Sequence, residues 1–179
     1  MHDSSYKKMS LFMDKYLDVK SKLNILDLGS QIVDEKHQTY KTLCDVNWHY
    51  DGCDIENGLN VDIIMPNPYS IPMPDDSYDV VISGQAFEHI EYIWLTILEI
   101  ARIVKPGGLI CIIAPGTGPI HNCPLDCWRF HPDGMDTLIK WMGFEKLETY
   151  IDIETKWWDC VLIAKKPDNW KPLYSIHKF

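Results

Sequence analysis

The stretch NILDLGSQI, from Asn24 to Ile32, joins an apolar run to an acid and a glycine. Residues 24–28 have the length and character of a buried strand, and Gly29 favours a tight turn at its end. A glycine there lets the backbone approach a ligand, because no Cβ intervenes. Ser30 and Gln31 stand where a nucleotide-binding loop usually carries more glycine. The stretch fits either a cofactor loop with a reduced glycine signature or a plain strand and turn.

Helical and strand patterns alternate along the rest of the chain. Helices are expected over residues 5–20, 34–45 (short and exposed), 88–105 and 132–142, and strands over 23–28, 48–55, 78–83, 109–114, 144–151 and 157–164, with a short apolar run at 61–65. The central strands are apolar on both faces, which is typical of a parallel sheet covered on both sides. We therefore predict an α/β fold with a Rossmann-like, mostly parallel seven-stranded sheet, helices on both faces and a C-terminal antiparallel hairpin.

The length of 179 residues fits a single domain, 1–179, with an N-terminal helical region at 1–22, a long loop at 115–131 and a tail at 166–179. The net charge of -9 argues against non-specific affinity for nucleic acid or an anionic membrane. No signal peptide or membrane span is predicted, and the cysteines resemble small buried residues more than a disulfide scaffold. A cytoplasmic protein is the simplest expectation.

Open α/β sheets bind ligands beyond the carboxyl ends of their strands, where the strand order reverses. Gly29 and Asp54 stand at the predicted ends of two successive strands. Asp54 could accept hydrogen bonds from both ribose hydroxyls of a nucleoside, although alone it could equally be a loop acid. The pair is a better indication of a nucleoside site than either residue.

Four segments in this order resemble motifs of class I S-adenosylmethionine-dependent methyltransferases of the type 11 group: ILDLGS, GCDI, IPMPDDSYDVVISGQAFEHI and EIARIVKPGGLICIIAP. Together they cover about residues 23–115. The resemblance implies S-adenosylmethionine as cofactor, with S-adenosylhomocysteine as product. It implies a cofactor site formed by Asp27, Gly29, Ser30, Asp54, Ile55, Asn67, Ser83, Gly84 and Gln85. His89 would lie near the cofactor, or it could be a structural histidine at a helix start.

The loop segment GPIHNCPLDCWRFHPDG, residues 118–134, resembles a pattern found in methyltransferases of bacterial surface-polysaccharide and nucleotide-sugar pathways. This resemblance implies a small acceptor, a saccharide or sugar nucleotide, held by Asp126, Trp128 and Arg129. Methylating a hydroxyl needs a base, and histidine suits that task. His121 is the first candidate, with His89 and His131 as competitors.

Two other interpretations of this loop stay open. Asp126 and Arg129 could form a structural salt bridge while Trp128 fills core. Four residues, His121, Cys123, Cys127 and His131, could bind zinc, but their spacing does not match the common zinc motifs, and no metal is expected.

The sequence therefore predicts methyl transfer to a hydroxyl of a small acceptor. The alternatives are a catalytically weak or inactive cofactor-binding subunit that supports a partner, and an N-methyltransferase acting on a small amine. A nicotinamide oxidoreductase would need G-x-G-x-x-G after the first strand, and a DNA methyltransferase would need an N/D-P-P-Y motif; neither is present. The tail, with Trp170 and Phe179, could dock on the body or on a second copy in a homodimer.

Overall fold

The structure, a computed structural model, describes residues 2–32 and 38–172. Within these residues the chain forms three α-helices, two short 3-10 helices and seven strands. In chain order these elements are α1 (Asp3–Tyr16), β1 (Asn24–Leu28), η1 (Tyr40–Leu43), β2 (His49–Asp54), β3 (Ile63–Ile64), β4 (Tyr78–Gly84), η2 (Phe87–His89), α2 (Ile93–Ile103), β5 (Val104–Pro115), α3 (Pro132–Met142), β6 (Glu145–Asp152) and β7 (Asp159–Lys165).

The seven strands form one sheet in the order β3-β2-β1-β4-β5-β7-β6. All neighbours are parallel except β7, which runs antiparallel to both β5 and β6. The chain moves outward through β2 and β3 and then returns to place β4 beside β1. The strand order therefore reverses between β1 and β4, and sheets of this kind bind ligands beyond the carboxyl ends of the strands at such a point. This arrangement confirms the predicted fold class, including the C-terminal antiparallel pair.

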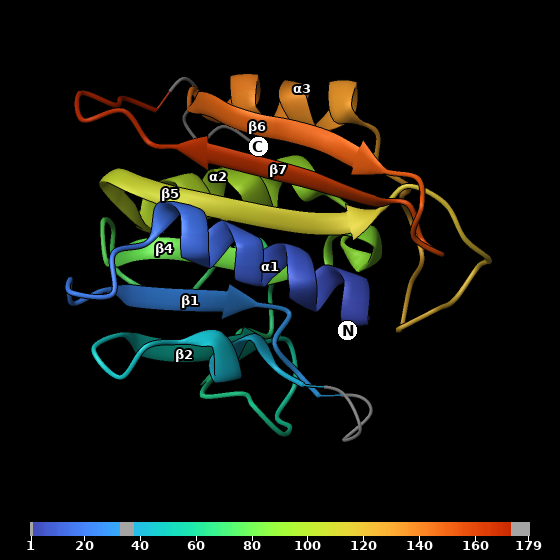
Figure 1. The fold of residues 1–179 in the computed structure, drawn as a ribbon, viewed down its shortest axis with the longest axis horizontal. Helices are drawn as coiled ribbons and strands as arrows, with labels where there is room; N and C mark the ends of the chain where they lie inside the picture. Colours follow the sequence, from blue (N-terminus) through green and yellow to red (C-terminus); the bar gives the residue numbers. More distant parts are fainter. Residues whose placement is uncertain (1, 33–37, 173–179) are drawn as a thin grey trace.

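Helices cover both faces of the sheet (Figure 1). The helix α1 lies on one face, where Met9, Phe12 and Met13 join a buried cluster with side chains of β1, β2, β4, β5 and β7. The helices α2 and α3 lie on the other face, where Ile97 and Met135 belong to a second cluster. Each helix is apolar along the stripe that meets the sheet, as its spacing in the sequence predicts.

Two predicted boundaries are wrong in an informative way. The helix expected from residue 88 begins at Ile93, and residues 87–89 form the short helix η2 instead. The carbonyl of Glu88 accepts hydrogen bonds from the backbone N–H groups of Cys127 (2.7 Å) and Trp128 (3.2 Å), so the long loop uses an acceptor that a continuous helix would need. The same helix ends at Ile103, because Pro106 favours an extended Lys105 before it, and β5 already begins at Val104.

Two other predictions fall partly outside the described residues. The short helix expected over 34–45 includes residues 33–37, which lie outside them, while 40–43 form the 3-10 helix η1. In the tail, Trp170 docks on the body: its indole N–H donates to the Met142 carbonyl at 2.7 Å, and its ring packs edge-on against Phe144. Phe179 lies outside the described residues.

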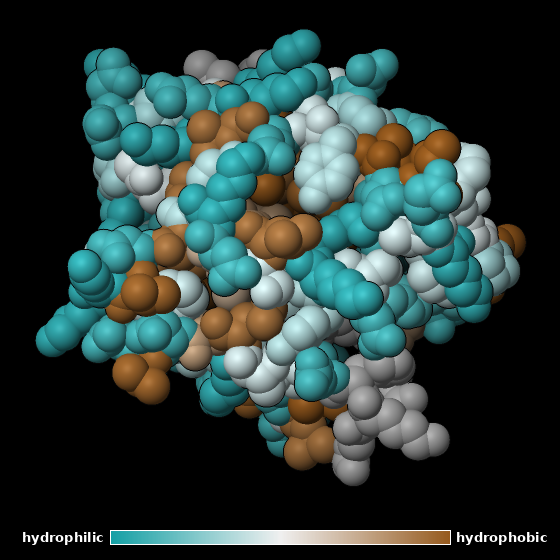
Figure 2. Space-filling view, viewed as in Figure 1, coloured by the Kyte–Doolittle hydropathy of each residue, from teal (hydrophilic) through white to brown (hydrophobic). Residues whose placement is uncertain are grey.

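The face that carries α1 is mostly hydrophilic, with separate small hydrophobic patches between the charged side chains (Figure 2). Across residues 2–32 and 38–172, none of the helices is both long enough and apolar enough to cross a membrane.

Candidate active site

Gly29 makes the turn at the end of β1. Its φ is +80°, a conformation that side chains with a Cβ rarely adopt, and its N–H donates to the Cys53 carbonyl at 2.8 Å. A Cβ added to Gly29 would lie 2.3 Å from the Cβ of Ala86, in the turn that follows β4. The loop after β1 is therefore packed against the turn after β4, and the fold itself requires glycine at this position.

Asp27 lies at the same strand end with an incompletely paired carboxylate. Its side chain is buried; Oδ2 accepts a 2.6 Å hydrogen bond from the hydroxyl of Tyr50, and Oδ1 has no partner within the described chain. Burial raises the pKa of Asp27 to about 7. The residue thus holds a buried carboxyl group that a cation or donor reaching Oδ1 would stabilise in its ionised form.

Replacing Asp27 with asparagine should make the free energy of unfolding less sensitive to pH. Folding raises the pKa of Asp27 from 3.8 to about 7, so the folded state favours the protonated carboxyl. Ionisation therefore lowers the free energy of unfolding; this loss is absent below the pKa of the unfolded state and complete above the pKa of the folded state. The stability advantage of Asp27→Asn over the wild type should grow by about 2–3 kcal/mol between about pH 5 and about pH 8. Urea unfolding of the cofactor-free proteins measures this, and parallel pH curves would contradict it.

Asp54, at the end of β2, is half-buried and already holds the loop after β1. Its Oδ2 accepts from the backbone N–H of Gln31 (2.9 Å) and its Oδ1 from that of Ile55 (2.7 Å). Burial raises the pKa of Asp54. Each carboxylate oxygen has a second lone pair, so both can still accept from a pair of ligand hydroxyls. Ile55 is exposed beside it and offers an apolar surface at this edge.

Three more of the predicted cofactor residues have structural partners. The buried Ser30 hydroxyl donates to the carbonyl of Asn60 at 2.8 Å, which ties the first loop to the segment after β2. The side-chain oxygen of Asn67 accepts from the backbone N–H of Tyr69 at 2.9 Å, and the residue is exposed. Ser83 is fully buried and donates to the Leu28 carbonyl at 2.7 Å, joining β4 to β1.

Gly84 and Gln85 form the turn at the end of β4. A Cβ on Gly84 would lie 1.9 Å from the hydroxyl oxygen of Tyr40, so the glycine makes room for this buried ring. Gln85 has a φ of +58° and donates from its side-chain nitrogen to Asp159 at 3.2 Å. The structure therefore gathers the predicted cofactor residues of β1, β2 and β4 at the carboxyl ends of these neighbouring strands, as the sequence predicts.

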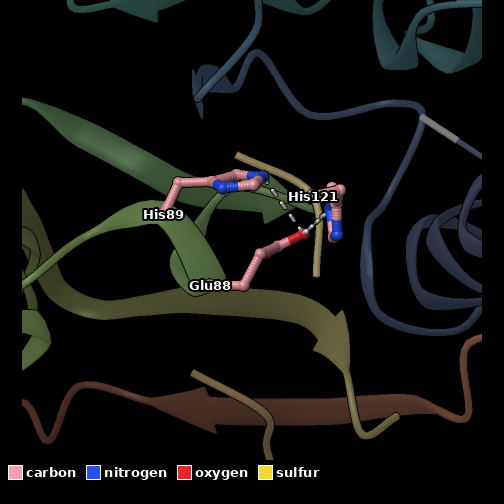
Figure 3. A group of neighbouring side chains, drawn as sticks. All are labelled: Glu88, His89 and His121. Atoms are coloured by element: carbon pink, nitrogen blue, oxygen red, sulfur yellow. Dashed lines mark ion pairs between the residues drawn. The ribbon is translucent and has the colours of Figure 1, made fainter. Parts of the chain in front are cut away.

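Glu88, His89 and His121 come together just after the turn that follows β4 (Figure 3). Glu88 Oε1 lies 3.6 Å from Nε2 of His89 and 4.0 Å from Nε2 of His121. Glu88 is fully buried, and neither of its carboxylate oxygens has a hydrogen-bond partner among the residues described. Burial raises the pKa of Glu88 to about 7 and lowers the pKa of His89. We call these three residues the Glu-His-His cluster.

Both histidines of the cluster are oriented by backbone carbonyls. Nδ1 of His89 donates to the Leu125 carbonyl, and Nδ1 of His121 donates to that of Pro119 at 3.2 Å. Carbonyl oxygens cannot donate, so these bonds place the proton of each neutral ring on Nδ1 and leave Nε2 as an acceptor. His121 is the more accessible of the two, with 36% of its side chain exposed.

The structural interpretation of the loop holds for Asp126 and Arg129. The Arg129 guanidinium donates to both carboxylate oxygens of Asp126, and to the Trp128 and Pro119 carbonyls at 2.8 and 2.9 Å. This pairing holds the pKa of Asp126 well below its usual range. Asp126 also accepts from the backbone N–H of His121 at 2.8 Å. The pair therefore shapes the loop that presents His121, and Nε of Arg129 is buried without a partner in the described chain.

Trp128 is part of a surface row of aromatic rings. Its indole N–H donates to the Ile90 carbonyl at 2.8 Å, and its ring lies 6.3 Å from that of Trp94. Trp94 adjoins Tyr92 at 5.7 Å, and Tyr92 adjoins Tyr69 at 5.4 Å. Trp128, Trp94 and Tyr92 are 36–47% exposed, so the row does not fill core.

His131 stands apart from the other candidate bases, since it is the exposed residue that precedes α3. The zinc set suggested by the spacing of His121, Cys123, Cys127 and His131 is not assembled either. Among the described residues, the Glu-His-His cluster is the one group of three metal-ligating side chains that gathers closely enough to hold an ion.

Glu88 is the site residue that the sequence did not identify. In the pair Glu88-His89 the sequence indicates a functional role for the histidine alone, because an acid at a helix start normally faces solvent. Nothing in the spacing indicates that the turn would be pulled inward by the loop amides. Tyr50 was likewise not identified, because a tyrosine in a strand is usually a packing residue.

Comparison with known proteins gives a partial family match. Residues 41–112 match the profile of the methyltransferase domain family. A protein of Mycolicibacterium smegmatis named as an S-adenosylmethionine-dependent methyltransferase is 31% identical over 97 residues, which are 50% of this chain and 37% of that protein. The 2-methyl-6-phytyl-1,4-hydroquinone methyltransferase 1 of Oryza sativa subsp. japonica is 34% identical over 98 residues, 54% of this chain and 25% of that protein. The chain thus spans well under half the length of these relatives.

Solved structures share the fold over almost the whole chain. The Burkholderia thailandensis 1,6-didemethyltoxoflavin N1-methyltransferase superposes with a TM-score of 0.72 at 12% identity, covering 93% of this chain and 80% of that one. The cyclase SpnF superposes with a TM-score of 0.68 at 16% identity, covering 90% of this chain and 80% of that one. A structure of the Haloferax volcanii complex between the Trm112 methyltransferase activator and a methyltransferase superposes with a TM-score of 0.64 at 16% identity. The match covers 94% of this chain and 97% of that one. Residues 41–112 therefore carry a methyltransferase-domain match within a chain that has the fold of solved methyltransferases.

Proposed function

We propose that this chain is an S-adenosylmethionine-dependent methyltransferase that acts on a small acceptor. The observation that carries the proposal is that Asp27, Gly29 and Asp54 gather at the carboxyl ends of β1 and β2, beside the point where the strand order reverses, while residues 41–112 match the methyltransferase domain. In-line transfer moves the methyl group from the sulfonium to the acceptor, and the cofactor supplies this reactivity. The protein then has to orient the acceptor and take its proton.

The proposed cofactor position uses the strand ends. The carboxylate of Asp54 would accept from the two ribose hydroxyls, since both oxygens keep a free lone pair. The unpaired Oδ1 of Asp27 would face the positively charged part of the cofactor, directly or through water. That positive charge would supply the partner that the buried carboxylate otherwise lacks.

The proton acceptor we propose is Nε2 of His121. Its Nδ1 bond to the Pro119 carbonyl leaves Nε2 unprotonated in the neutral ring. The buried carboxylate of Glu88, 4.0 Å from that nitrogen, would stabilise the imidazolium once the proton has arrived. His89 is the alternative base, but its ring is more buried.

For the acceptor, we propose a hydroxyl of a saccharide or sugar nucleotide. Support comes from the aromatic row of Tyr69, Tyr92, Trp94 and Trp128, which adjoins the loop that carries His121. Aromatic faces suit the apolar C–H faces of sugar rings. Arg129 is already engaged by Asp126, so it is less available to a phosphate than the sequence suggests.

Two other functions have specific support. A small amine is an alternative acceptor, because one solved structure of this fold is named as a 1,6-didemethyltoxoflavin N1-methyltransferase. A cofactor-binding subunit that works with a partner is a second, because another such structure is a complex with an activator. Measuring S-adenosylhomocysteine formation across a panel of sugar nucleotides and small amines separates the acceptors. Tight cofactor binding with no turnover on any of them favours the subunit.

Replacing Asp54 with alanine should weaken S-adenosylmethionine binding by about 1–3 kcal/mol, through the loss of charge-assisted hydrogen bonds to the ribose. Isothermal titration calorimetry on the two proteins measures the change. Glu145→Ala is the matched control, because Glu145 is an exposed acid at the first residue of β6, at the opposite end of the sheet. Absence of binding by the wild type, or equal affinities of wild type and Asp54→Ala, would contradict the proposed pocket.

A further inference from the structure

We propose that Glu88, His89 and His121 form a binding site for a divalent cation of the Zn²⁺ class. The three side chains come from two separate segments, the turn after β4 and the long loop after β5, and they point toward one another (Figure 3). Their ligand atoms all lie within 4.8 Å of one another. Zinc with bonds of about 2.0–2.2 Å spaces tetrahedral ligands by roughly 3.4 Å. The two separations between Glu88 and the histidine nitrogens, 3.6 and 4.0 Å, are close to this spacing, and the two histidines, no more than 4.8 Å apart, would have to move closer together on binding.

The outer contacts of the two histidines are those of metal ligands. Metal-binding histidines usually donate their second ring N–H to a carbonyl or carboxylate, which fixes the tautomer and aims the free nitrogen. His89 and His121 each do so, to the Leu125 and Pro119 carbonyls. The carboxylate of Asp126 also lies near the ring of His121, with its Oδ2 3.6 Å from Nδ1. Both free Nε2 atoms face Glu88.

The buried carboxylate of Glu88 is a second observation that points to a cation, independent of the histidine contacts. A carboxylate that is buried and has no hydrogen bond is costly, and proteins normally pair such a group with a cation or a donor. In the described chain neither oxygen of Glu88 has a hydrogen-bond partner, although the atoms are inaccessible to solvent. A cation between Oε1 and the two Nε2 atoms supplies the missing partner.

The chemistry of the ligands selects the ion. Two imidazoles and one carboxylate suit Zn²⁺ and neighbouring transition metals better than Mg²⁺ or Ca²⁺, which prefer oxygen ligands. Three protein ligands leave a fourth tetrahedral position for water or a ligand atom. The cation occupies the His121 nitrogen that the proposed methyl transfer uses for the proton, so bound zinc would block that transfer. Zinc binding itself requires neither cofactor nor acceptor, and its test is independent of the proposed function.

The test is calorimetric titration of the tag-free protein with Zn²⁺. We expect one ion per chain, and at least about 100-fold weaker binding for Glu88→Gln, His89→Ala and His121→Ala, since loss of outer contacts alone costs 10–100-fold. Two controls should bind like the wild type. His49→Ala removes an exposed histidine beside Asp51, away from the cluster. Cys123→Ser/Cys127→Ser removes the exposed thiols of the same loop.

A second measurement covers the case in which a ligand variant fails to fold. Co²⁺ bound to the wild type should give visible absorption bands without the intense near-ultraviolet band of a thiolate ligand. A wild type that binds no zinc, ligand variants that fold and bind it normally, or loss of binding in the cysteine variant with a thiolate band would each overturn the proposal.

Discussion

Replacing His121 with alanine should lower the rate of methyl transfer by about 10²–10⁴-fold and leave S-adenosylmethionine affinity almost unchanged. A positioned base contributes on that scale, and His121 is positioned by three contacts: its backbone N–H to Asp126, its Nδ1 to Pro119 and its Nε2 toward Glu88. None of these contacts involves the ends of β1 and β2, where the nucleoside would bind. Turnover is followed as S-adenosylhomocysteine release on the best acceptor, in metal-free buffer, and affinity by calorimetry.

Two further histidine variants show which of the three candidate residues is the base. His131→Ala should keep near-normal turnover, because His131 is exposed at the start of α3 and apart from the cluster. His89→Ala should have an intermediate effect, because His89 faces Glu88 but is more enclosed than His121. Near-normal turnover by His121→Ala, with loss in either of the other two, would transfer the role to that residue.

Replacing Gly29 with alanine should destabilise the folded protein by about 2–5 kcal/mol. A residue with a Cβ costs about 1–2 kcal/mol at a positive φ, and overpacking costs about 1–3 kcal/mol more. Both apply, since φ is +80° and the new Cβ would lie 2.3 Å from the Cβ of Ala86. The sequence suggests that a larger residue here would obstruct the cofactor. The structure shows that it meets the side chain of Ala86, in the turn after β4, first.

The matched control is Gly134→Ala. Gly134 lies within α3, and a Cβ there has no atom within 4 Å. Alanine is the better helix former, so this variant should be stabilised by about 0.4–1 kcal/mol. Urea unfolding of the three proteins gives both values. Equal stability of wild type and Gly29→Ala would show that the loop relaxes away from Ala86.

The sheet was predictable because its strands are continuous apolar runs with clear turn residues between them. Residues 24–28 and 132–142, for example, appear as predicted to the residue or nearly so. A mostly parallel sheet also follows from the alternation of helical and strand patterns, and it places Asp27 and Asp54 at the same, carboxyl end of their strands. Local pattern and tertiary structure agree at these positions.

The arrangement of the loop after β5 and the turn after β4 was less predictable, because it depends on contacts between segments that are distant in the sequence. The apolar spacing predicts Glu88 as the first residue of a helix, whereas in the folded chain the backbone N–H groups of Cys127 and Trp128 bind its carbonyl and its side chain is buried. Arg129 has the chemistry of a phosphate ligand, but Asp126, three residues before it, already satisfies its guanidinium. Sequence spacing shows which groups are available, and only the folded loop shows which of them have already found partners.

The bonds from the Cys127 and Trp128 amides to the Glu88 carbonyl bear on how this protein could change during evolution. The loop that would admit the acceptor also carries His121, and the same bonds fasten it to the turn that carries Glu88 and His89. A mutation that widens the entrance by moving this loop would also carry His121 away from Glu88. Acquisition of a bulkier acceptor would therefore require compensating substitutions in the turn after β4, so selectivity and proton transfer would be inherited as one linked trait.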